Sequence, residues 1–142
     1  MTRTRNMNYE NTFIAVATDT KATAGTPPKQ REGKPTIAEM EYEMIAAAPY
    51  AHTQEDVQFA VHVKKCGLTA GELKARRAAL WREFFAQPMA CMRTSPLPKT
   101  YGWGLHFNPA GKVALVGVET AEYRRLSQDK KIEQTRAMRN GR

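Results

Sequence analysis

A group of polar side chains that bind anions or exchange protons falls within one short stretch of the sequence, 93–119. Its members are Arg93, Ser95, Lys99, Tyr101 and His106. An imidazole has an ordinary pKa close to physiological pH, so it can give or take a proton there. Guanidinium and ammonium groups pair with carboxylates and phosphates. We therefore expect His106 to be a catalytic acid–base residue, with Arg93 and Lys99 holding an anionic group.

Two glycines leave one face of this stretch without side chains. Gly102 and Gly104 alternate with larger residues, so a ligand or another part of the backbone can approach closely there. The face leads to His106, and His62 joins it if its own segment lies beside the stretch. The candidate ligand-binding residues are accordingly Arg93, Ser95, Lys99, Tyr101 and His62. The alternative is architectural, with a hydrogen-bonded core histidine and a packed tyrosine.

Familiar catalytic and cofactor-binding motifs do not fit these residues. Gly102 and Gly104 are followed by Phe107 where a dinucleotide fingerprint has its third glycine, and a strand is predicted there instead of a helix. Ser95 and Lys99 are four residues apart, whereas the Ser-x-x-Lys arrangement needs three. The three histidines and two cysteines lack the short spacing of zinc ligands. We expect no metal and no cofactor.

The residues that follow predict a β-hairpin. Pro109 suits the second position of a type I turn, and Gly111 supplies the positive φ that closes a three-residue loop. The resulting register is given by the pairs Trp103–Gly117, Gly104–Val116, Leu105–Leu115, His106–Ala114 and Phe107–Val113. Alternation then places the aromatic residues on a core face and the glycines with His106 on the other.

Capping boxes predict two helices. Thr36 with Glu39 begins the first, which Pro49 stops, and Thr69 with Glu72 begins the second. Both segments carry apolar residues at helical spacing. These residues are Ile37, Met40, Met44, Ile45 and Ala48 in the first helix, and Leu73, Leu80, Trp81 and Phe84 in the second.

Two further segments are predicted as strands. Residues 11–18 are rich in β-forming side chains, and residues 56–64 alternate between apolar and other side chains with a period of two. Between the first strand and the first helix, residues 19–35 are polar and rich in proline and glycine, which predicts a long loop. That loop either covers a site or is dispensable. Residues 128–142 are expected to form a basic tail that frays.

These elements predict an α+β fold in a single domain, residues 1–142. We expect a small antiparallel sheet, including a C-terminal β-hairpin, packed against two amphipathic helices. The chain has 142 residues, enough for one independent core.

Charge and composition limit the classes of partner. The net charge is +8, and basic residues gather in 64–82 and 121–142, so nucleic acid is a possible partner. A solvated basic surface is the alternative. No apolar run approaches the roughly 20 residues of a membrane helix, and residues 1–13 lack the apolar core of a secretory signal. We expect a cytoplasmic protein with reduced cysteines and no membrane partner.

Several quoted stretches resemble one known family. They are NTFIAVATD, TIAEMEYEMIAAAPY, EDVQFAVH and RTSPLPKTYGWGLHFNPAGKVALVGVE, with the core pattern SPLxKxYGWGxH. They resemble a family of small, mainly bacterial proteins known only as a domain of unknown function. The resemblance covers nearly the whole chain and implies no activity and no catalytic residues.

Two functional hypotheses follow from the residues. The first is a small binding module for a polar or anionic ligand, a nucleic acid or a partner protein. The second is a small enzyme that uses His106 as acid and base, with Arg93 and Lys99 holding an anion.

Overall fold

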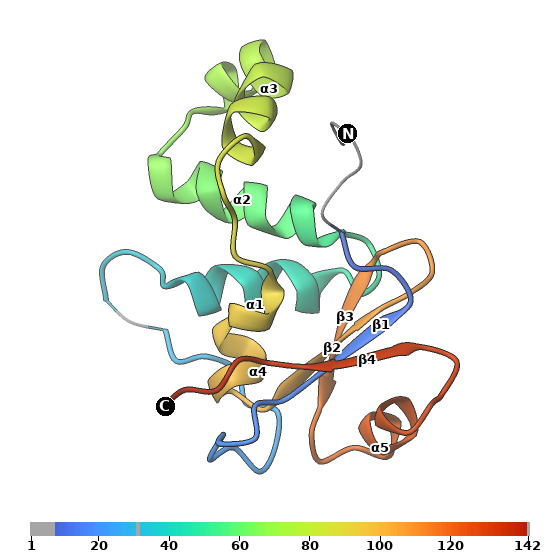
Figure 1. Cartoon of the computed structure of the whole chain (residues 1–142). Coiled ribbons are helices and arrows are strands. Elements are labelled where there is room, and N and C mark those ends of the chain that lie inside the picture. Colours follow the sequence, from blue (N-terminus) through green and yellow to red (C-terminus); the bar gives the residue numbers. More distant parts are fainter. Residues whose placement is uncertain (1–7, 31, 142) are drawn as a thin grey trace.

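The structure is a computed structural model that describes residues 8–30 and 32–141 (Figure 1). The predicted domain 1–142 therefore includes residues 1–7, 31 and 142, which lie outside the described residues. The elements in chain order are β1 (Thr12–Ala15), α1 (Ile37–Ala47), α2 (Gln54–Cys66), α3 (Ala70–Phe85), the short 3-10 turn η1 (Met92–Thr94), α4 (Pro96–Thr100), β2 (Trp103–Phe107), β3 (Val113–Gly117), α5 (Ala121–Ser127) and β4 (Glu133–Arg136). The fold is α+β, as predicted. Within the described residues, no helix is long and apolar enough to span a membrane.

The strands form one mixed sheet in the order β3-β2-β1-β4. The pairs β1–β2 and β2–β3 are antiparallel, whereas β4 runs parallel to β1. The prediction of an antiparallel sheet ending in a hairpin is therefore corrected: a parallel edge strand follows the hairpin. β4 has the sequence EQTR and is largely exposed. Backbone hydrogen bonds hold it, so no apolar alternation marked it in the sequence.

The pairing of β2 with β3 follows the register expected from the turn. Trp103 lies opposite Gly117, and Phe107 lies opposite Val113. Gly111 has φ +81°, and its N–H donates to the Asn108 carbonyl at 2.8 Å. The turn chemistry therefore sets which β2 side chains face each side of the sheet.

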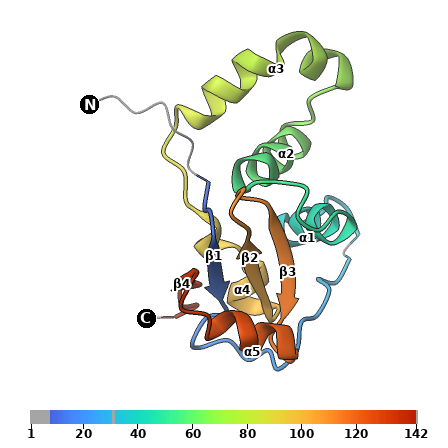
Figure 2. The ribbon, with the colours of Figure 1, turned by 90° about the vertical axis from the view of Figure 1, so that its right-hand side faces the viewer.

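Both faces of the sheet are covered. On one face, Leu105 and Phe107 pack with buried residues of α1, α2 and α4. On the other, Phe13 and Val116 pack against Tyr123 of α5 and its neighbour Leu126. Figure 2 shows α5 on one side of the strands and α1, α2 and α4 on the other. Alternate β2 side chains therefore point to opposite faces of the sheet, each of which is packed against a different cluster.

Residues 56–64 form most of helix α2, so the prediction of a strand was wrong. Thr53 and Asp56 make a capping box, which is the local signature of a helix start. Val57 and Val61 belong to one side of the helix and are buried, while Phe59, on the opposite side, meets Trp81 of α3. A helix with apolar residues on two opposite sides imitates a period of two.

Helix α3 forms where the sequence predicts it, with the Thr69–Glu72 capping box in place. Its packing differs from the prediction of a second helix against the sheet. None of its residues is buried, and it projects from the end of the molecule that carries α2 (Figure 1). Trp81 and Phe84 contact Phe59, while Arg76 interrupts the helical backbone with φ −127° and ψ 20°. Its apolar stripe contacts α2 through these aromatic rings.

The loop and the tail predicted from composition are held by specific contacts. The N–H of Thr26 donates to Tyr101 O, and the indole N–H of Trp103 donates to Thr26 O. In the tail, Ala137 is 3% exposed, and Asp19 accepts the backbone N–H groups of Asn140 and Gly141. In the described part of residues 128–142, β4 pairs with β1 and the Asp19 carboxylate accepts hydrogen bonds from the segment after β4.

Candidate functional site

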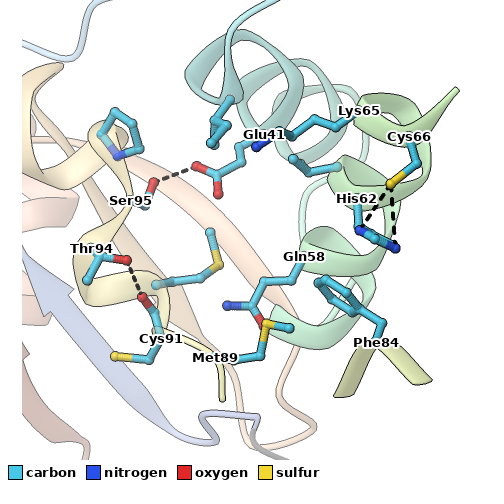
Figure 3. Close-up of a pocket in the computed structure, with 14 residues that line it drawn as sticks. Glu41, Gln58, His62, Lys65, Cys66, Phe84, Met89, Cys91, Thr94 and Ser95 are labelled. Atoms are coloured by element: carbon cyan, nitrogen blue, oxygen red, sulfur yellow. Dashed lines mark hydrogen bonds between the residues drawn. The ribbon is translucent and has the colours of Figure 1, made fainter. Parts of the chain in front are cut away.

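A pocket of about 570 Å³ lies between α1, α2, the end of α3 and the η1–α4 segment (Figure 3). Its volume is in the range of small-molecule sites. Most of its wall is apolar or sulfur-containing, and a few polar groups interrupt it. The lining residues that matter for its chemistry are Glu41, Gln58, His62, Lys65, Cys66 and Ser95.

Glu41 is the buried acid of this pocket. It lies on α1 one turn after Ile37 and one turn before Ile45, on the side of the helix that faces the core. Its side chain is 6% exposed. Burial raises the pKa of the carboxyl to about 7 from an ordinary 4.5, against the smaller opposite effect of a hydrogen bond from Ser95. Near neutral pH, Glu41 therefore exists in both protonation states.

Ser95 connects the acid to the start of α4. Its hydroxyl donates to Glu41 Oε1 at 2.6 Å and accepts the N–H of Leu97 at 3.1 Å as the N-cap of α4. Pro96 in the first turn is compatible with that helix start because proline has no N–H to satisfy. Within the described residues, Ser95 is the only hydrogen-bond partner of the Glu41 carboxylate.

The α2 side of the pocket carries a glutamine, a histidine and a thiol. Gln58 Nε2 donates to Ala90 O at 2.8 Å. The His62 ring stacks on Phe84 with centroids 4.3 Å apart. Cys66 Sγ lies 3.6 and 3.9 Å from the two His62 nitrogens, which is not the approach along one lone pair that a nucleophile–base pair needs. The pair is a contact on one helix face.

The part of the chain that the structure describes contains no set of metal ligands. No group of three or more histidine, cysteine, aspartate or glutamate side chains there could hold an ion. The arrangement can instead enclose a small molecule, with Glu41 offering either a proton or a negative charge.

The residues singled out in the sequence fall into three separate places. Ser95 and His62 both line the pocket. Arg93 donates from Nε to Arg136 O at 2.6 Å, beside β4, and the Lys99 carbonyl accepts the amide of Asn140 at 2.7 Å. Tyr101 packs against the main core cluster. Within the described residues, neither Arg93 nor Lys99 forms a hydrogen bond with His106 or lines the pocket.

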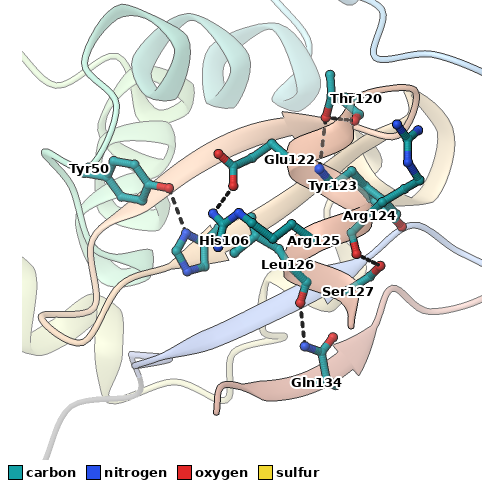
Figure 4. A network of polar contacts seen from close by, with 11 residues as sticks. Tyr50, His106, Thr120, Glu122, Tyr123, Arg124, Arg125, Leu126, Ser127 and Gln134 are labelled. Carbon is teal, nitrogen blue, oxygen red and sulfur yellow. Dashed lines mark hydrogen bonds and ion pairs between the residues drawn. The ribbon is translucent and has the colours of Figure 1, made fainter. Parts of the chain in front are cut away.

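His106 lies on the opposite face of the sheet, beside α5 (Figure 4). The Tyr50 hydroxyl is 2.7 Å from its Nδ1. Burial is the main cause that lowers the pKa of the imidazole, and burial likewise raises the pKa of the Tyr50 hydroxyl. Burial therefore favours the neutral form of both groups, and the donor in the hydrogen bond between them depends on the tautomer of the ring. Glu122 and Arg125 of α5, which form an ion pair, act on the same imidazole with opposite signs.

The glycine face that leads to His106 is filled by the protein itself. A Cβ on Gly104 would lie 2.7 Å from Phe13 Cζ and 2.8 Å from Tyr123 Cε2. A Cβ on Gly102 would lie 2.3 Å from Ala24 O, in the 19–35 loop. The bare face could be approached by a ligand or by another part of the chain, and in the structure it is covered by the chain itself.

Sequence reasoning missed Glu41, the central residue of the pocket, although one signal pointed to it. Residue 41 falls among Ile37, Met44, Ile45 and Ala48 at helical spacing, so the apolar stripe of α1 contains a carboxyl group. A charged residue in the middle of such a stripe becomes buried with the stripe. That pattern was sufficient to single out a buried acid, though it says nothing of the pocket beside it.

Comparisons with known proteins supply a family and nothing more specific. The model of a family described as "Family of unknown function (DUF6157)" matches residues 4–142. No curated protein matches the chain, and no solved structure matches it.

Proposed function

The chain belongs to DUF6157, a family of unknown function, and we propose that it is a binding module whose pocket beside Glu41 takes a small, largely apolar ligand that carries one polar group. The observation that carries the proposal is a buried carboxyl, hydrogen-bonded to the Ser95 hydroxyl, at the wall of a pocket of about 570 Å³. Burying an ionisable group costs free energy, and such a group inside an apolar cleft is a frequent mark of a binding or active site.

The rest of the pocket supports the same proposal. Val61, Phe84, Met89 and Met92 offer apolar surface, and methionine side chains adapt to ligands of varied shape. Gln58 and Ser95 supply polar atoms at fixed positions. His62 and Ser95 are thus proposed as ligand-binding residues in this pocket. Arg93 and Lys99, which do not line it, are not part of this proposed site.

A fragment screen followed by NMR titration tests the proposal. Fragments that bind the wild-type protein are expected to shift the backbone signals of Glu41, Gln58 and Ser95 and to lose at least about tenfold in affinity in Met89→Trp, which fills the pocket. Met138→Trp is the matched control, because Met138 is exposed and outside the pocket lining. Fragments that bind Met89→Trp as well as wild type, or that bind elsewhere, would contradict the proposal.

A second candidate function is acid–base catalysis at His106. The observation that favours it is the contact of Tyr50, whose hydroxyl lies 2.7 Å from His106 Nδ1. The backbone of Tyr50 has φ +58°, a conformation that costs energy in a tyrosine. A substrate screen with His106→Gln as comparison tests it. Catalysis at this residue requires that turnover disappears while the melting temperature stays close to that of the wild type.

The compartment and a macromolecular partner are proposed on less specific grounds. Cys66 and Cys91 are free thiols, which supports a cytoplasmic location, where thiols stay reduced. A nucleic-acid partner stays a prediction from the net charge of +8. If that partner exists, its affinity falls steeply with salt.

A further inference from the structure

We propose that the ligand of the Glu41 pocket is a small protonated amine with an apolar body, whose N–H groups bind the Glu41 carboxylate and Gln58 Oε1. This inference rests on the proposed function and adds the chemical class of the ligand. It follows from which hydrogen-bonding groups in the pocket are already used and which are left.

The two inner hydroxyl donors of the pocket and one N–H of Gln58 are committed to partners within the protein. The Ser95 hydroxyl donates to Glu41 at 2.6 Å, and the Thr94 hydroxyl donates to Cys91 O at 2.8 Å. The Gln58 amide donates one of its two N–H groups to Ala90 O at 2.8 Å. A hydroxyl has one proton to give, so Ser95 and Thr94 have no donor left for a ligand.

The acceptors, in contrast, retain capacity. A carboxylate offers about four lone-pair sites, and Ser95 uses one site at Glu41. Gln58 is fixed through its nitrogen, and Oε1 accepts no hydrogen bond from the part of the chain that the structure describes. Figure 3 shows Glu41 reaching from α1 toward Ser95, and Gln58 extending from α2 on the same side of the η1–α4 segment. A ligand that fits these groups is therefore a hydrogen-bond donor.

Charge and burial select a cation among the possible donors. A buried carboxylate gains most from an opposite charge, because both are partly removed from water. The apolar wall formed by Val61, Phe84 and Met92 takes the body of the ligand. Lys65 also lines the pocket, but its side chain is exposed and long enough to turn its ammonium into water.

Three probes with the same phenylethyl body and head groups of different charge test the inference. They are 2-phenylethylamine, 2-phenylethanol and 3-phenylpropionate, titrated by NMR into the full chain at pH 6, 7 and 8. We expect the amine to bind most tightly, and its affinity to rise about tenfold from pH 6 to pH 8 as a carboxyl with a pKa of about 7 ionises. The alcohol is expected to change less than about twofold.

Glu41→Gln separates the carboxylate from the cavity. It keeps an oxygen that accepts from Ser95, so we expect the fold and the binding of the alcohol to persist, while the amine loses its preference and its pH dependence. Three results would contradict the proposal of an amine ligand without contradicting the proposed pocket. They are equal binding of amine and alcohol to the wild type, tighter binding of the propionate, and an amine affinity that does not rise with pH. Failure of all three probes to bind, or equal binding to Met89→Trp, would overturn the proposed function as well.

Discussion

The two faces of the sheet differ in how closely they are packed, and the sequence suggests the opposite of what the structure shows. The face of Gly102 and Gly104 is bare in the sequence and closed in the structure, since Phe13, Tyr123 and the 19–35 loop occupy it. The opposite face carries large side chains, and among the helices on that side α1, α2, the end of α3 and the η1–α4 segment leave a pocket of about 570 Å³. Small residues allow close packing, and close packing excludes a ligand.

The pocket arises because several short elements meet without filling the space between them. α2 contacts α1 on one side and meets α3 mainly through aromatic rings on the other. The segment from Ala86 to Cys91 contains no helix or strand and leads to η1. The cavity thus lies at a junction of elements, where function concentrates in many proteins.

The two titratable groups on these faces respond to burial with opposite consequences. Glu41 is an acid, so burial raises its pKa and favours the neutral form. His106 is a base, so burial lowers its pKa and again favours the neutral form. The first destabilises the folded protein as pH rises, and the second destabilises it as pH falls.

The largest expected effect tests whether the glycine face is closed. Gly104→Val is expected to lower the free energy of unfolding by about 3 kcal/mol, because its Cβ would lie within 3 Å of Phe13 and Tyr123. Met89→Ala in the open pocket is expected to cost about 1 kcal/mol or less. Urea denaturation measures both. Since valine is the better strand former, an unchanged or raised stability in Gly104→Val would show that the face is open.

An intermediate effect concerns the pH dependence due to Glu41. The folded pKa of about 7 lies above the ordinary 4.5, so the stability that this group contributes is complete below about pH 4.5 and is lost as pH rises through 7. We expect the difference in unfolding free energy between wild type and Glu41→Gln to fall by about 2 to 3 kcal/mol between pH 4.5 and pH 8.

Denaturation curves at several pH values measure this difference, with Glu43→Gln as the matched control because Glu43 is an exposed carboxylate on the same helix. A flat difference for Glu41→Gln, or the same slope in both variants, would mean that Glu41 is ionised in the folded protein well below neutral pH.

The smallest expected effect concerns the Tyr50–His106 pair. Tyr50→Phe removes one hydrogen bond at a side chain that is 42% exposed, so we expect a loss of about 1 kcal/mol or less. The pKa of His106 is expected to lie below its ordinary 6.5 and to rise in this variant, because we expect the hydroxyl to donate to Nδ1 and so to favour the neutral ring. An NMR pH titration of the imidazole in wild type and variant measures the two pKa values. An unchanged His106 pKa in Tyr50→Phe would show that the bond is not made in solution.

The same His106 gives the opposite branch of the pH profile. Its folded pKa is below 6.5, so the stability it contributes is present above that value and is lost as pH falls through the folded pKa. The plot of unfolding free energy against pH is therefore expected to show two separate slopes, one due to Glu41 and one due to His106. Glu41→Gln removes the slope above pH 4.5, and His106→Gln removes the slope below pH 6.5.

Local signals in the sequence predicted much of the secondary structure. The capping boxes at Thr36 and Thr69 were sufficient to begin α1 and α3, and the turn at Asn108 set the β2–β3 register. Each of these depends on side chains within a few residues of the backbone groups they satisfy. The error at α2 also concerns a local signal, since the prediction followed the apolar period of two and did not use the capping box of Thr53 and Asp56.

The candidate site was predicted only in part. Ser95 and His62 were named from the sequence and both line the pocket, but they were grouped with His106, which lies on the other face of the sheet. Segments near in sequence were assumed to share one site. The N-capping of α4 by Ser95 turns this residue toward α1, while the β2 register turns His106 toward α5.

By itself, the sequence determined the helix starts, the hairpin turn, the parity of β2 and the presence of a carboxyl within an apolar stripe, because each depends on neighbours along the chain. Only the tertiary structure decided that the glycine face is filled, that β4 runs parallel to β1 and that Glu41 lies beside a cavity. Those features depend on contacts between residues far apart in the chain, such as Glu41 and Ser95, and no local pattern encodes the space left between them.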